Sequence, residues 1–154
     1  MNTIIIVNRE LTTEEIELVN SGFDDLSIEE GIALESTERM SFVALQGDNL
    51  IGCSSGLAHK NGEQYSGWFY LTDLFIEKEF RNQGIGADLL KALEEKIITV
   101  GVKNIWLWTS GASTLRFYKR YGYKQFVEME HWYSDGSSRI GLRKTIPVHN
   151  NLDL

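Results

Sequence analysis

The segment from residue 67 to residue 100 constrains the fold most, because it predicts a long strand, a glycine turn and a long amphipathic helix in direct succession. Residues 67–76 are rich in aromatic and aliphatic side chains, which favours a strand. Residues 84–100 carry one apolar stripe at helical spacing, formed by Ile85, Leu89, Leu93, Ile97 and Val100. A further strand is predicted at residues 105–109, so a β-α-β unit brings one parallel strand pair into the sheet.

The remaining sequence predicts mostly antiparallel strands interrupted by helices. Thr12 and Glu15 form a capping box that begins the first helix, and Gly22 is expected to end it. In total we expect about seven strands, at residues 3–7, 40–46, 50–57, 67–76, 105–109, 124–131 and 138–145. About four helices are expected, at residues 13–22, 26–33, 84–100 and 112–121. This order predicts a mixed α/β fold of α+β character.

Length and composition indicate one globular domain. The chain has 154 residues, of which 42% are hydrophobic and 24% charged. We expect residues 1–147 to form a single domain and residues 148–154 to form a C-terminal tail. No apolar stretch approaches the roughly 18 residues of a membrane span, and no signal peptide is recognisable, so no membrane partner is expected. The single cysteine, Cys53, excludes an intrachain disulfide, which favours a cytoplasmic location.

The charge is negative and unevenly distributed. The net charge of −7 argues against nucleic acid as a partner, because phosphate binding needs a basic surface. Residues 9–38 contain ten acidic side chains against Arg9 alone, a net charge of −9. This segment is either a solvated acidic helix face or a surface that receives a cation.

The glycine turn before the long helix has the features of an anion site. No Ser, Thr, Asp or Asn directly precedes this helix, so its first backbone amides have no obvious side-chain partner. Gly84 and Gly86 let a ligand approach the backbone, and Arg81 adds a guanidinium suited to phosphate. A P-loop and a dinucleotide fingerprint both fit poorly, since Ala87 follows Gly86 and Leu89 stands where a small residue is needed. A phosphate or pyrophosphate site and a plain structural turn both remain open.

Two motifs resemble those of the GNAT superfamily, the acyl-CoA-dependent N-acetyltransferases. Residues 81–86 match its Arg/Gln-x-x-Gly-x-Gly/Ala signature, and residues 117–123 resemble its Phe-Tyr-x-Lys-x-Gly-Phe segment. The resemblance covers about residues 40–130. It implies a GNAT fold, in which a twisted, mostly antiparallel sheet contains a splayed parallel pair. It also implies that acetyl-CoA is the cosubstrate and a primary amine the acceptor.

The resemblance also implies roles for individual residues. The coenzyme A pyrophosphate would lie on the turn formed by Arg81, Asn82, Gln83, Gly84, Ile85, Gly86 and Ala87. Pantetheine would insert beside the strand edge of Leu74, Phe75 and Ile76, pairing with its backbone, and an amide near Ile76 would stabilise the oxyanion. Tyr118 would protonate the leaving thiolate, and Ser113, Thr114 and Phe117 would line the cosubstrate.

Asp73 is the candidate for the acceptor side of the reaction. An amine must lose a proton before it attacks, and a carboxylate, or a water held by one, can accept that proton. Asp73 is therefore a candidate base or cation anchor; alternatively it caps a strand bulge or pairs with Arg81. The sequence departs from the family at Gly111, where many members have Asn, and Ser110 or Ser113 are possible replacements for its polar contact. The acidic residues 9–38 fall where the family forms its acceptor cleft, which favours a cationic small molecule as acceptor.

Other chemical signals are weaker. Ser54 lies in a Gly-x-Ser-x-Gly pattern but without the strand–turn–helix context of a hydrolase, and no metal ligand spacing links His59, His131 and His149. Cys53 is expected to pack as a thiol, which favours direct transfer in a ternary complex. A non-catalytic acyl-CoA sensor and a protein-interaction domain remain alternatives. Residues 128–133 are aromatic enough to allow a homodimer.

Overall fold

The structure, a computed structural model, describes residues 2–147 of the chain. Residues 148–154, which include the expected tail and His149, lie outside the described residues. The chain divides into two compact units, Met1–Glu35 and Ser36–Leu154, and each is considered by itself below. The expectation of one domain over residues 1–147 stays a prediction. No helix in the described part is long and apolar enough to cross a membrane.

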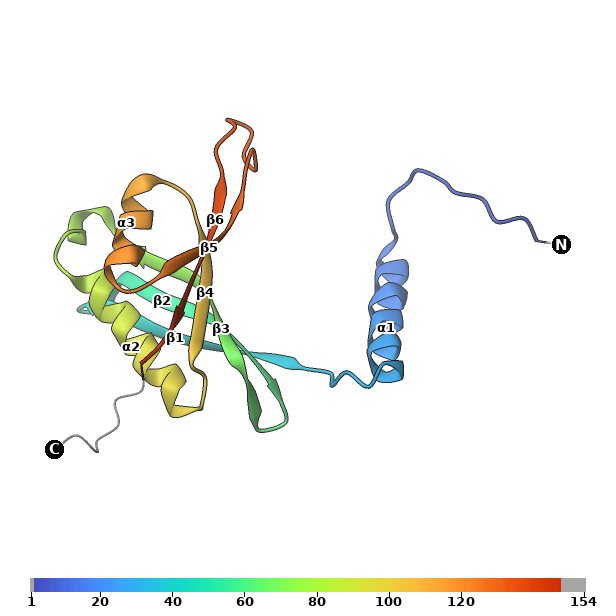
Figure 1. Cartoon of the computed structure of the whole chain (residues 1–154), viewed down its shortest axis with the longest axis horizontal. Coiled ribbons are helices and arrows are strands. Elements are labelled where there is room, and N and C mark those ends of the chain that lie inside the picture. Colours follow the sequence, from blue (N-terminus) through green and yellow to red (C-terminus); the bar gives the residue numbers. More distant parts are fainter. Residues whose placement is uncertain (1, 148–154) are drawn as a thin grey trace. The chain divides into compact units, whose positions relative to one another are not determined.

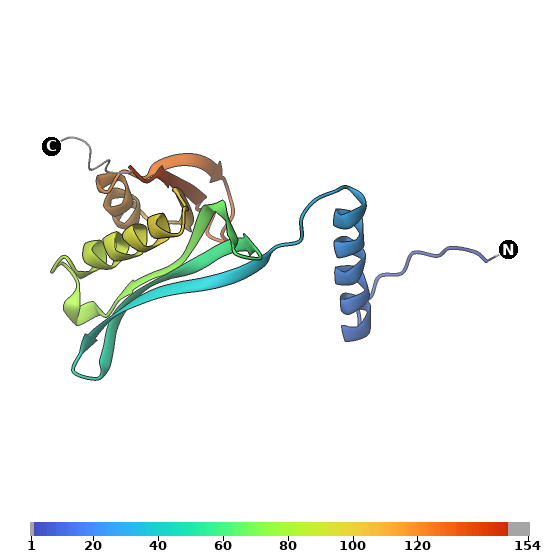
Figure 2. The same cartoon turned by 90° about the horizontal axis from the view of Figure 1, so that it is seen from below.

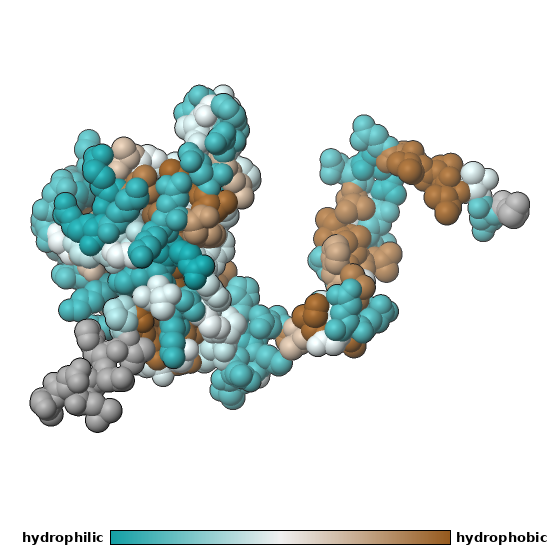
Figure 3. Space-filling model, viewed as in Figure 1, coloured by the Kyte–Doolittle hydropathy of each residue, from teal (hydrophilic) through white to brown (hydrophobic). Residues whose placement is uncertain are grey.

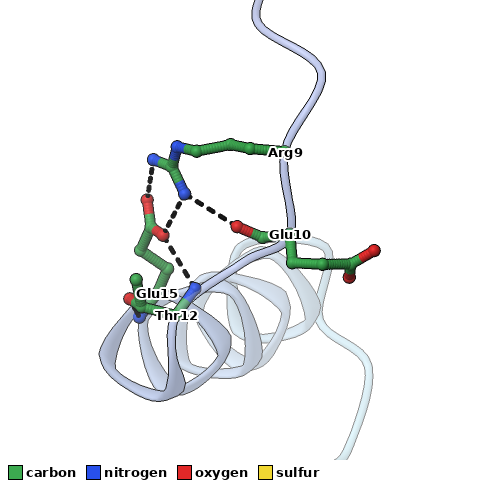
Figure 4. A network of polar contacts seen from close by, with 4 residues as sticks. All are labelled: Arg9, Glu10, Thr12 and Glu15. Atoms are coloured by element: carbon green, nitrogen blue, oxygen red, sulfur yellow. Dashed lines mark hydrogen bonds and ion pairs between the residues drawn. The ribbon is translucent and has the colours of Figure 1, made fainter.

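The first unit contains one helix, α1 (Thr13–Glu29), with the expected capping box at its start. Thr12 Oγ1 accepts from the Glu15 amide, and the Glu15 carboxylate accepts from the Thr12 amide. Arg9 donates two hydrogen bonds to the same carboxylate, at 2.7 and 2.8 Å (Figure 4). These bonds, with that of Arg9 the strongest, lower the pKa of Glu15 to about 2. The network orders the chain that enters the helix.

Two predictions for this unit are wrong. The helix does not end at Gly22 but runs on to Glu29, so residues 13–22 and 26–33 do not form two helices. A glycine ends a helix when it adopts a left-handed backbone, and the residue that does so is Gly31, with φ of +74°. Residues 3–7 form no strand, and Ile4, Ile5, Ile6 and Val7 are exposed within their unit (Figure 3). Strand propensity alone does not make a strand without a hydrogen-bonded partner.

The second unit is a six-stranded sheet with two α-helices on one side (Figures 1 and 2). Its elements are β1 (Ser36–Gln46), β2 (Asn49–Asn61), β3 (Gln64–Ile76), a 3-10 turn (Lys78–Phe80), α2 (Ile85–Thr99), β4 (Asn104–Thr109), α3 (Ala112–Arg120), β5 (Lys124–Met129) and β6 (Arg139–Thr145). The strand order is β1-β2-β3-β4-β6-β5, and only β3 and β4 run parallel. The mixed α/β fold is thereby confirmed, with six strands and three α-helices instead of about seven and four.

The hydrophobic core lies between the sheet and α2. The predicted stripe of this helix is confirmed, because Leu89, Leu93 and Ile97 are buried. Leu93 and Ile97 belong to one core cluster with the buried sheet residues Phe69, Leu71, Ile105, Leu107 and Leu142. Burial of this apolar surface, at ~25 cal/mol per Å², stabilises the packing of α2 against the sheet and so fixes the place of the turn that precedes the helix.

A bulge in β3 reverses which side chains face α2. Ser55 pairs with Asp73 and Gly56 pairs with Leu71, so Thr72 is an extra residue without a partner on β2. Before the bulge the buried residues are Phe69 and Leu71, whereas after it the partly buried residues are Leu74 and Ile76. Asp73 is therefore directed to the opposite face of the sheet. Without the bulge it would point into the core.

Candidate active site

The turn between β3 and α2 presents backbone amides without partners. Gly84, at the N-cap, has φ of +82° and offers no side-chain cap. The first amide of the helix to find an intrahelical acceptor is that of Asp88, which donates to the Gly84 carbonyl at 3.1 Å. The amides of Ile85, Gly86 and Ala87 therefore point outward at the positive end of the helix dipole. This is the arrangement that binds phosphate groups at helix N-termini.

Two adjoining pockets lie along this turn, with volumes of about 440 and 410 Å³. The first is lined by Leu74, Phe75, Ile76, Arg81, Gly86, Ser113, Thr114, Phe117 and Tyr118. The second extends past the turn and is lined by Ile76, Phe80, Arg81, Asn82, Gly84, Ile85, Gly86, Ala87, Phe117, Arg120 and Tyr121. The structure thus brings together every predicted cosubstrate residue except Gln83, whose side chain donates to the Glu79 carbonyl.

Sequence reasoning missed three residues of the second pocket: Phe80, Arg120 and Tyr121. Arg120 is the most informative, because it places a second guanidinium in the same pocket as Arg81. The signal was present in the sequence. Arg120 follows Phe117 by three residues on a predicted helix, so both side chains share one helix face.

The backbone of β3 is exposed beside the first pocket. The Glu77 amide donates to the Ile51 carbonyl at 2.8 Å, and opposed residues of antiparallel strands alternate between bonded and non-bonded pairs. Leu74 and Ile76 therefore direct their backbone groups away from β2, toward β4. Pairing between β3 and β4 stops after Tyr70 and Trp106, so the two strands separate at this level. The Ile76 carbonyl accepts from Arg81 Nε at 3.0 Å, which leaves the amides of Leu74 and Ile76 directed into the gap.

Tyr118 joins the core to the first pocket. Only 5% of its surface is exposed, and its ring packs edge-on against those of Phe117 and Tyr123. Burial raises its pKa well above the usual value of 10. The phenol therefore keeps its proton at physiological pH, and it can donate that proton to a group bound in the pocket.

Asp73 lies apart from both pockets, on the sheet face opposite α2. Its Oδ2 accepts from Thr72 Oγ1 at 2.6 Å and lies 3.8 Å from Arg39 Nη1. Of the two structural roles considered for Asp73, the position beside a bulge is correct. Its cationic neighbour is Arg39 and not Arg81. The side chain of Asp73 is 57% exposed, so it remains accessible to a second substrate.

The weaker signals have structural explanations. Ser54 is fully buried and donates to the Leu89 carbonyl at 2.9 Å, which ties β2 to α2. Cys53 is partly buried and lines neither pocket. Gly111 is the N-cap of α3 with φ of +88°, a conformation that favours glycine over the Asn of the family. Within residues 2–147, no group of three or more His, Cys, Asp and Glu side chains is placed to hold a metal ion.

Comparison with known proteins agrees with this geometry. The model of the acetyltransferase (GNAT) domain matches residues 37–125. Thialysine N-epsilon-acetyltransferase of Sus scrofa is 33% identical over 78 residues, which cover 46% of this chain and 45% of that protein. The match thus spans less than half the length of that curated relative.

Solved structures share the fold. An acetyltransferase from Bacillus cereus ATCC 14579 superposes with a TM-score of 0.75 at 19% identity, covering 92% of this chain and 98% of the other. An aminoglycoside 6'-N-acetyltransferase complexed with coenzyme A gives a TM-score of 0.62 at 21% identity, covering 74% and 76%. Because the matched residues 37–125 run from β1 into β5 and include the glycine turn, the separated strands and Tyr118, the chain belongs to the GNAT acetyltransferase family.

Proposed function

We propose that the chain transfers an acetyl group from acetyl-CoA to a primary amine of a small molecule or a protein, by direct attack in a ternary complex. The observation that carries this proposal is the continuous pair of pockets. They join unpartnered amides at the start of α2, the exposed backbone of β3 and the protonated phenol of Tyr118. The amides suit a pyrophosphate, the strand backbone suits an extended thiol arm, and the phenol suits a leaving thiolate that needs a proton.

Each part has a distinct role in the proposal. The amides of residues 85–87 and the guanidinium of Arg81 bind the pyrophosphate. The amide of Leu74 pairs with pantetheine as a neighbouring strand would. The amide of Ile76 stabilises the oxyanion, and Tyr118 donates its proton to the thiolate. Asp73, or a water that it holds, accepts the proton of the amine.

The acceptor, the oligomeric state and the cellular location are the less constrained parts of the proposal. The name of the Sus scrofa relative refers to an N-epsilon amine, which supports a primary amine as acceptor. The net charge of −9 over residues 9–38 supports an acceptor that is cationic at its amine. A homodimer through residues 128–133 and a cytoplasmic location stay predictions, the latter supported by the single cysteine.

The test combines two measurements on the whole chain. Calorimetry with coenzyme A should give binding heat, and a panel of primary amines with acetyl-CoA should release thiol with at least one acceptor. Binding heat without thiol release from any amine would leave a non-catalytic acyl-CoA sensor. Absence of binding heat would contradict both functions and leave a protein-interaction domain.

Replacing Arg120 by Ala should raise the Kd of coenzyme A about fivefold and weaken its dependence on salt. The reason is the loss of one exposed charge interaction of about 1 kcal/mol in the second pocket. Calorimetry at two salt concentrations measures both effects. Arg116 is the matched control, because it lies on the exposed side of the same helix and lines neither pocket. Equal effects of Arg116→Ala and Arg120→Ala would mean that only net charge matters.

Replacing Asp73 by Asn should lower kcat at least about tenfold at saturating acetyl-CoA, because the amide cannot accept the amine proton. The Kd of coenzyme A should not change, since Asp73 lines neither pocket. Steady-state kinetics with the best acceptor of the panel measures the effect. An unchanged kcat would assign the proton acceptor to another group.

A further inference from the structure

Two faces of the sheet border the gap between β3 and β4. On the side of α2 and α3, Leu74, Ile76 and Tyr118 enclose the first pocket, which the proposed function assigns to the cosubstrate. The side chains on the opposite face of the sheet therefore border the path of the acceptor. On the β3 side of the gap these are Thr72, Asp73 and Phe75, and on the β4 side the residue facing this way is Trp108.

Arg139 stands at this border with its hydrogen-bonding groups unused. Trp108 pairs with Gly141, and Arg139 lies two residues before Gly141 on the same face of β6. Its guanidinium carbon is 4.7 Å from the ring centre of Trp108 and 5.1 Å from that of Trp132. The side chain is partly buried, yet within residues 2–147 it makes no ion pair and donates to no protein acceptor. Two indole faces hold the guanidinium in place and leave its N–H edge free for an anion.

The other two arginines on this face differ from Arg139 in a decisive way. Arg39 already donates to Ser55 and Thr72, at 2.9 and 3.0 Å, and lies beside Asp73. Arg143 also stacks on an indole, 4.6 Å from the centre of Trp68, but it pairs with Trp106 at a level where β3 and β4 are still joined. Of these three arginines, Arg139 alone combines a free guanidinium with a position at the gap.

We propose that Arg139 binds a carboxylate of the acceptor, so that the preferred acceptors carry a primary amine at one end and a carboxylate at the other. The inference rests on the proposed function for the location of the amine. β6 lies two strands from β3 in the sheet. Paired strands at ~4.8 Å would put them roughly 10 Å apart, and the separation of β3 from β4 at this level makes the distance larger. An α-amine is too close to its own carboxylate to span this distance, whereas an amine at the end of a side chain of about lysine length reaches it.

The charges of the site fit such a zwitterion. Asp73 on the β3 side attracts the ammonium group before it loses its proton, and Arg139 on the β6 side attracts the carboxylate. Arg39, held by Ser55 and Thr72, keeps Asp73 in place. The guanidinium of Arg139 can donate two parallel hydrogen bonds to a carboxylate, which fixes the direction in which the acceptor lies.

The test compares three ligands that share one amine: 6-aminohexanoate, 6-aminohexanamide and hexylamine. Calorimetry on the whole chain saturated with coenzyme A should show 6-aminohexanoate binding at least about tenfold more tightly than the other two, the effect of a charge-assisted hydrogen bond. Arg139→Gln should remove this preference, and Arg139→Lys should restore part of it. Arg143→Gln, the matched control, should keep it. Equal binding of the three ligands, absence of binding, or equal loss in the Arg143 variant would overturn the proposal.

Acetyl transfer to the same ligands separates this inference from the proposed function. With the aminohexanoate ligand as acceptor, Arg139→Gln should raise the acceptor KM about tenfold, while the acetyl-CoA KM and the turnover of hexylamine stay unchanged. Preferential binding of the aminohexanoate without any acetyl transfer would keep the carboxylate site and contradict the transferase proposal. Transfer to all three ligands with equal KM would support the transferase proposal and contradict the carboxylate site.

Discussion

Tyr118→Phe is expected to lower kcat about a hundredfold at saturating acetyl-CoA, while the Kd of coenzyme A stays within about twofold. Loss of a general acid typically costs a factor of 10² or more. The ring of Phe fills the same space between Phe117 and Tyr123, so the pocket keeps its shape. Steady-state kinetics measures kcat, and calorimetry measures the Kd.

Tyr123→Phe provides the matched control for this prediction. Tyr123 is a second buried phenol that packs against Tyr118, but it lines neither pocket. Its hydroxyl is buried and finds no hydrogen-bond partner among residues 2–147. Removal of an unsatisfied buried hydroxyl is neutral or stabilising, so kcat should not change and the melting temperature should not fall. Equal losses of kcat in the two variants would assign to Tyr118 a packing role only.

The direction of the Tyr118 pKa shift also predicts the alkaline side of the pH profile. In the proposed reaction Tyr118 acts as a protonated phenol, and burial raises the pKa of Tyr118 above its usual value of 10. Tyr118 therefore still carries its proton at pH 10, and kcat should not decrease up to about this pH. A decline of kcat that begins near neutral pH in the wild type and is absent in Tyr118→Phe would contradict the shift.

The parts of the molecule that could be predicted are those specified by local sequence. The stripe from Ile85 to Ile97 and the glycines at 84 and 86 encode a helix and its turn through neighbouring residues, and both are found where expected. The residues around the pockets followed from the family motifs. The helix end expected at Gly22 was a local error, whereas the other features that were not predicted depend on partners far apart in sequence. Residues 3–7 lack a pairing strand, and Arg39 reaches Thr72 across 33 positions.

The bulge at Thr72 is the clearest case of information that local sequence lacks. Thr72 and Asp73 continue an apparently regular strand, and alternation would place them on opposite faces. The extra residue is recognised only from the register with β2, where Ser55 and Gly56 face Asp73 and Leu71. Arg39 then reaches the side chains of both Thr72 and Asp73. The orientation of the candidate base therefore depends on the packing of β2 against β3.

Gly56→Ala should destabilise the fold by about 3 kcal/mol, or roughly 10 °C in melting temperature, because β2 has no room for a side chain beside this bulge. A Cβ at Gly56 would lie 2.2 Å from the Tyr70 carbonyl oxygen and 2.3 Å from a ring carbon of Phe69. Phe69 is fully buried, so its ring has no free space to enter. To remove this steric overlap, β2 must move relative to β3, and the movement would change the backbone at the neighbouring bulge.

Gly67→Ala separates this contact from the general effect of replacing a strand glycine. A Cβ at Gly67 would meet only the Asn104 amide nitrogen at 3.8 Å, an ordinary contact, so the melting temperature should change little or rise. Thermal unfolding of both variants gives the comparison, and kcat measured well below the melting temperature gives a second one. If the bulge positions Asp73, the folded Gly56→Ala protein should lose kcat and retain coenzyme A affinity, because Gly56 lines neither pocket. Full kcat in a destabilised Gly56→Ala protein would show that the register of β2 and β3 serves stability alone.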